Sequence, residues 1–200
     1  MGNVKERKTA NREIILEKAI ELGRDDGWHK LTVRNLAQRL NYAPPVLYQY
    51  FEGKDHLEKE ILKYGFDLLR AKLFEAADEK QSMEDKLLAL ALARFDFALE
   101  HESLHSLMFS SGKPAWFKKC TVDGMLQTKT LVSDLLCRIS GRKEPVYDLI
   151  SNFIALIKGY TFFATEMPDD QSCAHFFGKM QPKQAFEEAM KRFIASIKEQ

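Results

Sequence analysis

Residues 101–105 are the segment whose residue types and spacing come closest to metal chemistry. The segment reads HESLH, and H-E-x-x-H on a helix places two imidazoles on one face for zinc, with the glutamate as general base. No recognisable third ligand follows at the usual distance, and the sequence SSGKP at 110–114 breaks the helix soon afterwards. A half-exposed junction between helices therefore fits the segment better than a metal site. A small zinc-dependent hydrolase using HESLH remains the alternative function, and the metal content of the purified protein separates the two.

No other pattern indicates catalysis. The sequence contains no GxSxG elbow, Walker phosphate loop, GxGxxG turn or pair of catalytic carboxylates. Cys120, Cys137 and Cys173 are odd in number and have no CxxC spacing, which argues against a disulfide framework and against a thiolate zinc site. We therefore expect no catalytic residue, no metal and no cofactor.

Residues 32–54, TVRNLAQRLNYAPPVLYQYFEGK, indicate a different chemistry. Apolar residues from Val33 to Leu40 recur at helical spacing, and Thr32 stands at the N-cap position. Asn41 tolerates the left-handed conformation with which helices often end. Pro44 and Pro45 then open another helix, because prolines are tolerated in a first turn. Two short helices joined by a tight turn are typical of a helix-turn-helix, whose second helix lies in the major groove of DNA.

The second of these helices separates into a buried side and an outward side. Leu47 and Phe51 lie four residues apart and are predicted to point together into the core. The prolines give an apolar edge that can approach a thymine methyl, tyrosine hydroxyls can donate to phosphate oxygens, and glutamine can pair with adenine. The residues predicted to face outward are Pro44, Pro45, Val46, Tyr48 and Gln49, with Tyr50 at the edge of this face and Lys54 placed to meet the DNA backbone as a point charge.

These residues resemble a known family. Arg12, Ala19 and Gly27, followed by TVRNLAQRL and LYQYFEGKDHL, are similar to the DNA-binding module of the tetracycline-repressor (TetR) family, whose pattern is close to TTxxIAxxxGVSxxxLYxHFxxKexL. The resemblance covers about residues 10 to 60. It implies Thr32 on a phosphate, Arg34 near the groove, Pro44, Pro45, Val46 and Gln49 toward bases, and Tyr48, Tyr50 and Lys54 on the backbone.

Three positions depart from the family pattern. Asn41 replaces the usual glycine of the turn, and Tyr42 replaces the usual valine. Ala43 stands where serine or threonine normally caps the next helix, so a cap worth about 1 kcal/mol is absent. These changes bear on the operator sequence more than on the fold.

Helices must position all of these residues, because almost every segment repeats apolar residues at spacings of three and four. We predict an all-α protein with a three-helix DNA-binding domain over residues 1–54. A larger effector-binding and dimerisation bundle of about six helices is expected over residues 55–200. Its helices are predicted at about 55–77, from an N-cap at Ser82, at 104–108, at 115–140, from Pro145 to before residue 168, and at 183–198.

The helix beginning at Pro145 is apolar on nearly all sides, so it must be buried on nearly all sides. One face can pack on its own core and the other needs a partner. The last helix has an apolar stripe that could join it in a two-fold, four-helix interface, and the TetR resemblance implies the same homodimer. The interface residues we predict are Phe153, Ile157, Phe186, Phe193 and Ile197. A purely intrachain core is the alternative.

Fourteen phenylalanines and two tryptophans are many for 200 residues, and most lie in the long-helix region. The resemblance implies that this region holds a small apolar or aromatic effector, and such pockets are lined by apolar side chains with a few polar groups. The predicted ligand-binding residues are Phe95, His105, Met108, Trp116, Met125, Lys129, Phe153 and Tyr160. A constitutive DNA binder with a filled core is the other possibility.

The charge of the chain allows DNA binding only at a local surface. The formal net charge is +1, whereas residues 1–50 hold nine lysines and arginines against six acidic residues. The polar start MGNVKERKTANRE does not resemble a signal peptide, and the apolar stretch 149–164 is too short and interrupted to span a bilayer. We therefore expect a cytoplasmic, ligand-responsive repressor with no membrane partner, which binds a palindromic double-stranded operator as a homodimer.

Overall fold

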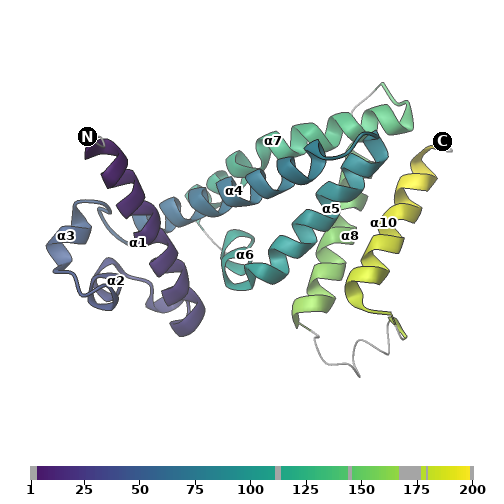
Figure 1. The fold of residues 1–200 in the computed structure, drawn as a ribbon. Coiled ribbons are helices and arrows are strands. Elements are labelled where there is room, and N and C mark those ends of the chain that lie inside the picture. Colours follow the sequence, from purple (N-terminus) through teal and green to yellow (C-terminus); the bar gives the residue numbers. More distant parts are fainter. Residues whose placement is uncertain (1–3, 111–113, 144–145, 167–176, 179, 199–200) are drawn as a thin grey trace. The chain divides into compact units, whose positions relative to one another are not determined.

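All regular structure in the described part of the chain is helical (Figure 1). The computed structural model describes residues 4–110, 114–143, 146–166, 177–178 and 180–198, with side chains from residue 11 onward. The elements are α1 (Val4–Asp26), η1 (Trp28–Lys30), α2 (Val33–Arg39), α3 (Pro44–Tyr48), α4 (Lys54–Asp78), α5 (Met83–Glu100), α6 (Glu102–Met108), α7 (Ala115–Ser140), α8 (Tyr147–Glu166) and α10 (Pro182–Lys198). The all-α prediction is confirmed. Pro145 and Cys173 lie outside the described residues.

Local sequence signals set the limits of α2 and α3 as predicted. The Thr32 hydroxyl oxygen accepts a hydrogen bond from the Asn35 amide at 3.0 Å, which caps α2. Asn41 adopts φ 55°, in the left-handed region that ends many helices. α3 begins at Pro44, and its N-cap residue Ala43 makes no side-chain capping bond. The short helix η1 was not predicted.

Contacts divide the chain into two compact units. One comprises Met1–Asp67 with Ser103–Gly124, and the other comprises Leu68–Glu102 with Met125–Gln200. The helices α4 and α7 each contribute to both units. The domain boundary expected at residue 54 stays a prediction.

The core of the first unit holds α1, α2, α3 and the start of α4 together. Its fully or nearly fully buried side chains include Ile15, Ala19, Leu22, Leu36, Leu47, Phe51, Leu57 and Ile61. The Trp28 indole N–H donates to the carbonyl of Ser103 at 3.1 Å. A Cβ at Gly23 would lie 2.5 Å from the same indole ring, so only glycine allows Trp28 this approach to α1.

The second unit packs α5, α8 and α10 side by side (Figure 1). Ion pairs join α10 to α5 at both ends, with Lys183 Nζ 2.7 Å from Asp96 and Lys198 Nζ 2.5 Å from Glu84, so these two helices run antiparallel. Between them, the rings of Phe95 and Phe186 stack with centroids 5.0 Å apart. The predicted cap of α5 is confirmed, because the Ser82 hydroxyl oxygen accepts from the Asp85 amide at 3.0 Å.

No described helix is long and apolar enough to cross a membrane.

Candidate nucleic-acid interface

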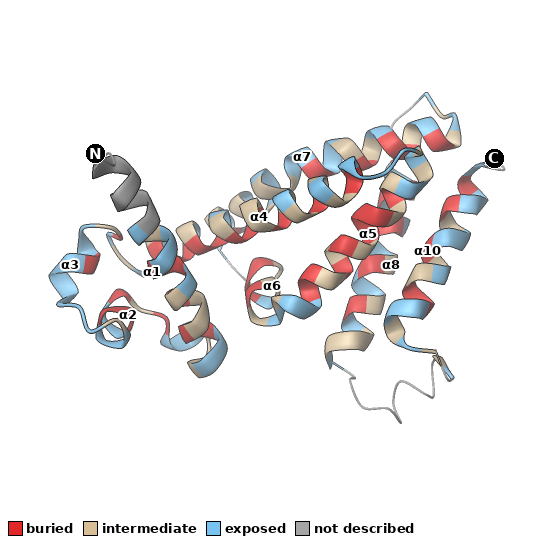
Figure 2. Ribbon diagram, in the orientation of Figure 1, coloured by how far each residue is buried: buried red, intermediate tan, exposed pale blue. Residues whose placement is uncertain are grey.

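The helix α3 presents an outward face to solvent. Figure 2 shows α3 almost wholly exposed around a single buried position, which is Leu47. Pro44, Pro45, Val46 and Gln49 are exposed, and Tyr48 keeps 52% of its surface. Leu47 and Phe51 are completely buried, which confirms their predicted role as anchors. With Leu47 buried on α3 and Phe51 buried just after it, the other side chains of α3 are left exposed to a partner.

The remaining predicted DNA-binding residues lie around this helix. Arg34 is exposed on α2, and Tyr50 is half-buried with its ring centroid 6.3 Å from that of Phe51. Thr32 accepts the capping bond with its oxygen, so its O–H can still donate to a phosphate. Lys54 opens α4 with its Nζ 3.8 Å from Glu58, whose side chain is buried while that of Lys54 remains exposed. These residues lie on the helix-turn-helix or, for Lys54, at the start of the following helix α4, and their contacts with DNA stay a prediction.

The segment between α3 and α4 is held by a histidine that sequence reasoning missed. The Nδ1 atom of His56 accepts a hydrogen bond from the Glu52 amide at 3.1 Å. An accepting Nδ1 places the ring proton on Nε2, which lies 3.7 Å from Glu60. Glu60 also pairs with Arg12 of α1 at 2.5 Å. These contacts fix the exit of α3 relative to α1 and α4.

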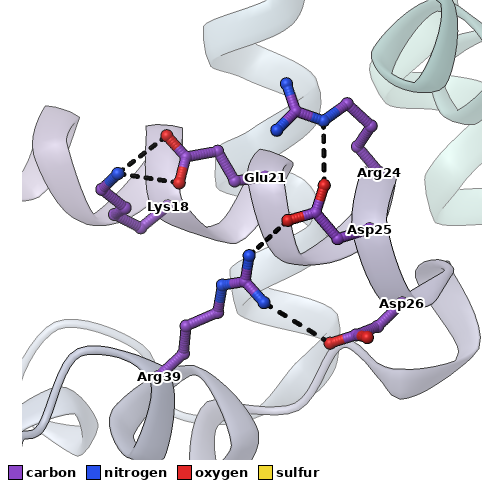
Figure 3. Close-up of polar contacts among 6 residues, drawn as sticks. All are labelled: Lys18, Glu21, Arg24, Asp25, Asp26 and Arg39. Atoms are coloured by element: carbon purple, nitrogen blue, oxygen red, sulfur yellow. Dashed lines mark hydrogen bonds and ion pairs between the residues drawn. The ribbon is translucent and has the colours of Figure 1, made fainter.

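A cluster of ion pairs joins the end of α1 to the end of α2 (Figure 3). The Arg39 guanidinium contacts Asp25 through one nitrogen and lies 3.6 Å from Asp26 through the other. Asp25 also accepts from Arg24 at 3.0 Å, and the hydrogen bonds from Arg24 and Arg39 lower the pKa of its carboxyl below the ordinary value. The sequence signal for this clamp is the acidic end of α1 together with the arginine that ends α2, and helical spacing alone does not predict it.

The clamp predicts an acid-dependent contribution to stability. A carboxylate with a lowered folded-state pKa stabilises the fold above its unfolded pKa of 3.8, and the contribution is lost as the pH falls through the folded value. We expect Arg39→Gln to lower the Tm slightly at pH 7, with the difference from wild type shrinking below pH 3.8. Thermal unfolding followed by circular dichroism between pH 2.5 and 7 measures this. Lys18→Gln is the control, because it breaks only the pair with Glu21 inside α1.

The HESLH segment does not form the arrangement expected of a zinc helix. His101 is the C-cap of α5, with φ −124° and ψ 41°, and α6 begins only at Glu102. The two imidazoles instead pack on aromatic rings, His101 at 4.7 Å from Phe97 and His105 at 4.8 Å from Phe109. Among the described residues, no group of three His, Cys, Asp or Glu side chains could hold a metal ion. The zinc hydrolase alternative is therefore not supported.

The predicted ligand-binding residues fall in both compact units. His105, Met108 and Trp116 belong to the first, whereas Phe95, Met125, Lys129, Phe153 and Tyr160 belong to the second. Several have protein partners already: the Trp116 ring lies 5.0 Å from Lys59 Nζ, and the Tyr160 ring lies 5.5 Å from Phe186. Phe95, Met108 and Phe153 are buried, and Lys129 is exposed. A role for any of them in ligand binding stays a prediction.

The predicted dimer residues occupy mostly inward positions. Phe153, Ile157, Phe186 and Ile197 are buried within the protomer, and Phe193 is half-buried. The exposed apolar side chains of α8 are different ones: Tyr147, Ile154 and Phe162. Their spacings of seven and eight residues place them on one face of the helix. A part for the five predicted residues in an interface stays a prediction, and the exposed face of α8 was found only in the structure.

Comparison with known proteins agrees with this geometry. Residues 15–61 match the family described as "Bacterial regulatory proteins, tetR family". The chain is 27% identical over 100 residues to the HTH-type transcriptional repressor KstR2 of Mycolicibacterium smegmatis, covering 50% of this chain and 48% of that protein. It is 33% identical over 89 residues to the HTH-type transcriptional activator FasR of the same organism, covering 44% and 40%. The chain thus spans less than half the length of these relatives.

The fold is also similar to solved structures. The TetR family transcriptional regulator PfmR from Thermus thermophilus matches with a TM-score of 0.66 at 17% identity, covering 90% of this chain and 97% of that one. At so low an identity the likeness shows the fold alone. It covers 90% of this chain and so extends well beyond residues 15–61, the segment that the family match covers.

Proposed function

We propose, from the match of residues 15–61 to the tetR family of bacterial regulatory proteins, that the protein is a homodimeric, ligand-responsive repressor that binds a palindromic operator. The observation that carries the proposal is the outward face of α3. Its exposed side chains combine an apolar edge at Pro44, Pro45 and Val46 with the polar groups of Tyr48 and Gln49. Apolar contacts and amide pairs read bases, whereas tyrosine hydroxyls bind phosphates.

Dimerisation would supply the second reading helix that a palindromic operator requires. A single five-residue recognition helix reaches only a few base pairs, and a two-fold partner adds a second half-site about 34 Å away. The exposed apolar face of α8 supports a partner there, because Ile154 and Phe162 retain 42% and 53% of their surface. We therefore place the two-fold interface at the bundle of the second unit, with α8 contributing its outward face.

Release from DNA is proposed to follow from a small apolar or aromatic effector. Such an effector must bind the conformation that does not fit the operator better than the one that does. One relative is named a repressor and the other an activator. A reporter whose promoter overlaps the operator distinguishes the two for this chain: repression predicts higher reporter output when the gene is deleted, and activation predicts lower output.

Selection from a random duplex library tests DNA binding directly. We expect wild-type protein to enrich duplexes that share a two-fold symmetric motif. Affinity for these duplexes should fall steeply and log-linearly with salt, because phosphate contacts release counterions. A library that shows no enrichment, with binding insensitive to salt, contradicts the proposal.

Tyr48→Phe tests the assignment of a phosphate contact. Loss of one hydroxyl is expected to weaken binding to all duplexes about equally, by about 1 kcal/mol per subunit. Fluorescence anisotropy on the enriched duplex and on single-base variants of it measures this. Tyr64→Phe serves as the control, because the Tyr64 hydroxyl donates to Glu17 of α1 and is assigned no contact with DNA. Selective loss at one base pair contradicts the assignment.

Gln49→Ala tests the reading role instead. Because a side-chain amide pairs with one base, we expect a changed preference at a single symmetric position of the half-site. Discrimination there should drop by about 1–3 kcal/mol while other positions keep theirs. Repeating the library selection with the variant measures the change, and an identical enriched motif refutes the role.

A further inference from the structure

Tyr42 is an exposed aromatic residue that the family resemblance does not assign to any contact. It keeps 49% of its surface, close to the 52% of Tyr48. It lies in the turn between α2 and α3, two residues before the first residue of α3. Tyrosine at protein surfaces commonly serves as a contact residue, because its ring is rigid and its hydroxyl is polar.

The backbone holds Tyr42 in this position. Its amide donates to the carbonyl of Ala37 at 2.9 Å, and the Asn41 amide donates to Gln38 at 3.1 Å, with Asn41 in the left-handed conformation. This hydrogen-bonding pattern is the Schellman motif, in which the residue at the position of Tyr42 often packs back on the helix. The helix positions that such a residue covers, Leu36 and Ala37, are completely buried, and Tyr42 nevertheless keeps about half of its surface in solvent. The turn's own backbone hydrogen bonds are complete.

The start of α3 lacks the donors that usually hold phosphates at a helix N-terminus. Phosphates bind there through free backbone N–H groups. Pro44 and Pro45 have no N–H, and the Val46 amide is used by the carbonyl of Ala43 at 2.9 Å. The side chains of residues 43–46 are all apolar. If α3 enters the major groove with its N-terminal end, residues 43–46 offer no polar side chain to the neighbouring DNA backbone.

We propose that the Tyr42 hydroxyl donates a hydrogen bond to an operator phosphate next to the N-terminal end of α3, and so supplies the donor that Pro44 and Pro45 remove. The inference rests on the proposed DNA-binding function and adds one residue to it. Tyr42 and Tyr48 then bracket the apolar edge in the sequence, each with a hydroxyl for the DNA backbone. The contact positions the reading helix and carries no base preference of its own.

The first test compares Tyr42→Phe with wild type on the duplex that wild-type protein enriches from a random library. The variant keeps the ring and the turn, and we expect binding about fivefold weaker for each half-site on every duplex tested. The slope of log affinity against log salt should stay unchanged, because a neutral donor is lost. Lys54→Gln is the comparison variant: because it removes a charge, we expect it to reduce the slope of log affinity against log salt by about 1. Tyr64→Phe is the control for loss of a tyrosine hydroxyl elsewhere, because that hydroxyl donates to Glu17 within the protein.

The second test locates the phosphate. Single phosphates of the duplex are replaced one at a time by neutral methylphosphonates, and each duplex is titrated with both proteins. At one symmetric phosphate we expect the ratio of the wild-type affinity to the Tyr42→Phe affinity to fall from about five to about one. A neutral methylphosphonate is a weaker acceptor, so the wild-type protein loses the hydrogen bond that the variant already lacks. Equal binding of Tyr42→Phe and wild type to the unmodified duplex overturns the assignment, and so does a loss that no phosphate substitution reduces. If wild-type protein enriches no duplex, the proposed function itself fails and this contact with it.

Discussion

Phe51→Ala is expected to destabilise the DNA-binding domain by about 3–5 kcal/mol and to abolish operator binding. The Phe51 side chain is completely buried at the end of α3. Its amide bonds to the carbonyl of Leu47 at 2.9 Å, and its ring lies edge-on to His56 at the start of α4, with centroids 6.2 Å apart. Truncation leaves a cavity where α3 is held against the core, and a five-residue helix has little stability without that packing.

Thermal and urea unfolding measure the loss of stability, and hydrogen exchange localises it. Amides of residues 32–51 should exchange much faster in Phe51→Ala, whereas those of α10 should remain protected. Phe51→Leu is the matched variant, because it keeps much of the apolar volume, and we expect it to retain binding with a smaller loss of stability. A Phe51→Ala protein with the Tm and duplex affinity of wild type would show that the ring does not anchor α3.

Ile154→Glu is expected to convert the proposed dimer into a monomer and to lower operator affinity by on the order of 100-fold or more. Ile154 lies on the same exposed face of α8 as Phe162. A carboxylate buried in a two-fold apolar interface is brought close to its symmetry mate, so it loses hydration and meets a like charge. The fold of the protomer should remain, because Ile154 makes no part of its buried core.

Sedimentation equilibrium at micromolar concentration measures the association state, and anisotropy on the full palindrome and on a single half-site measures the effect on DNA. Binding to the half-site should be nearly unchanged. Val122→Glu is the control, since Val122 is at least as exposed but lies on α7. A variant that stays dimeric would move the interface away from α8, and a monomeric wild type would contradict the dimer itself.

Sequence patterns predicted several features that depend on neighbours in the chain. The cap at Thr32, the left-handed Asn41 and the start of α3 at Pro44 are all interactions within a few residues, so residue type and spacing predict them. The inward pointing of Leu47 and Phe51 follows from helical spacing in the same way. The family resemblance extended this reading to the role of the helix on DNA.

The HESLH segment shows where such patterns fail. Its spacing fits one helix face, yet the chain leaves the helix at His101, whose ring packs on Phe97. Ending a helix within a polar segment costs the local chain little free energy, so tertiary packing decides at which residue the helix ends. The clamp from Arg39 to Asp25 and Asp26 was hidden for a related reason, because its partners lie more than ten residues apart.

The sequence by itself determined the α-helical fold, the helix that we propose to read DNA and the buried anchors of that helix, because these rest on local spacing and capping. Only the tertiary structure decided which apolar side chains of α8 are buried inside the protomer and which stay exposed. A helix that is apolar on nearly all sides has no sequence pattern that marks its inner face. The exposure of Tyr42 was settled in the same way. Tyr42 keeps 49% of its surface although Leu36 and Ala37, the positions that such a residue often covers, are completely buried, and the hydrogen bonds of the turn alone do not indicate this exposure.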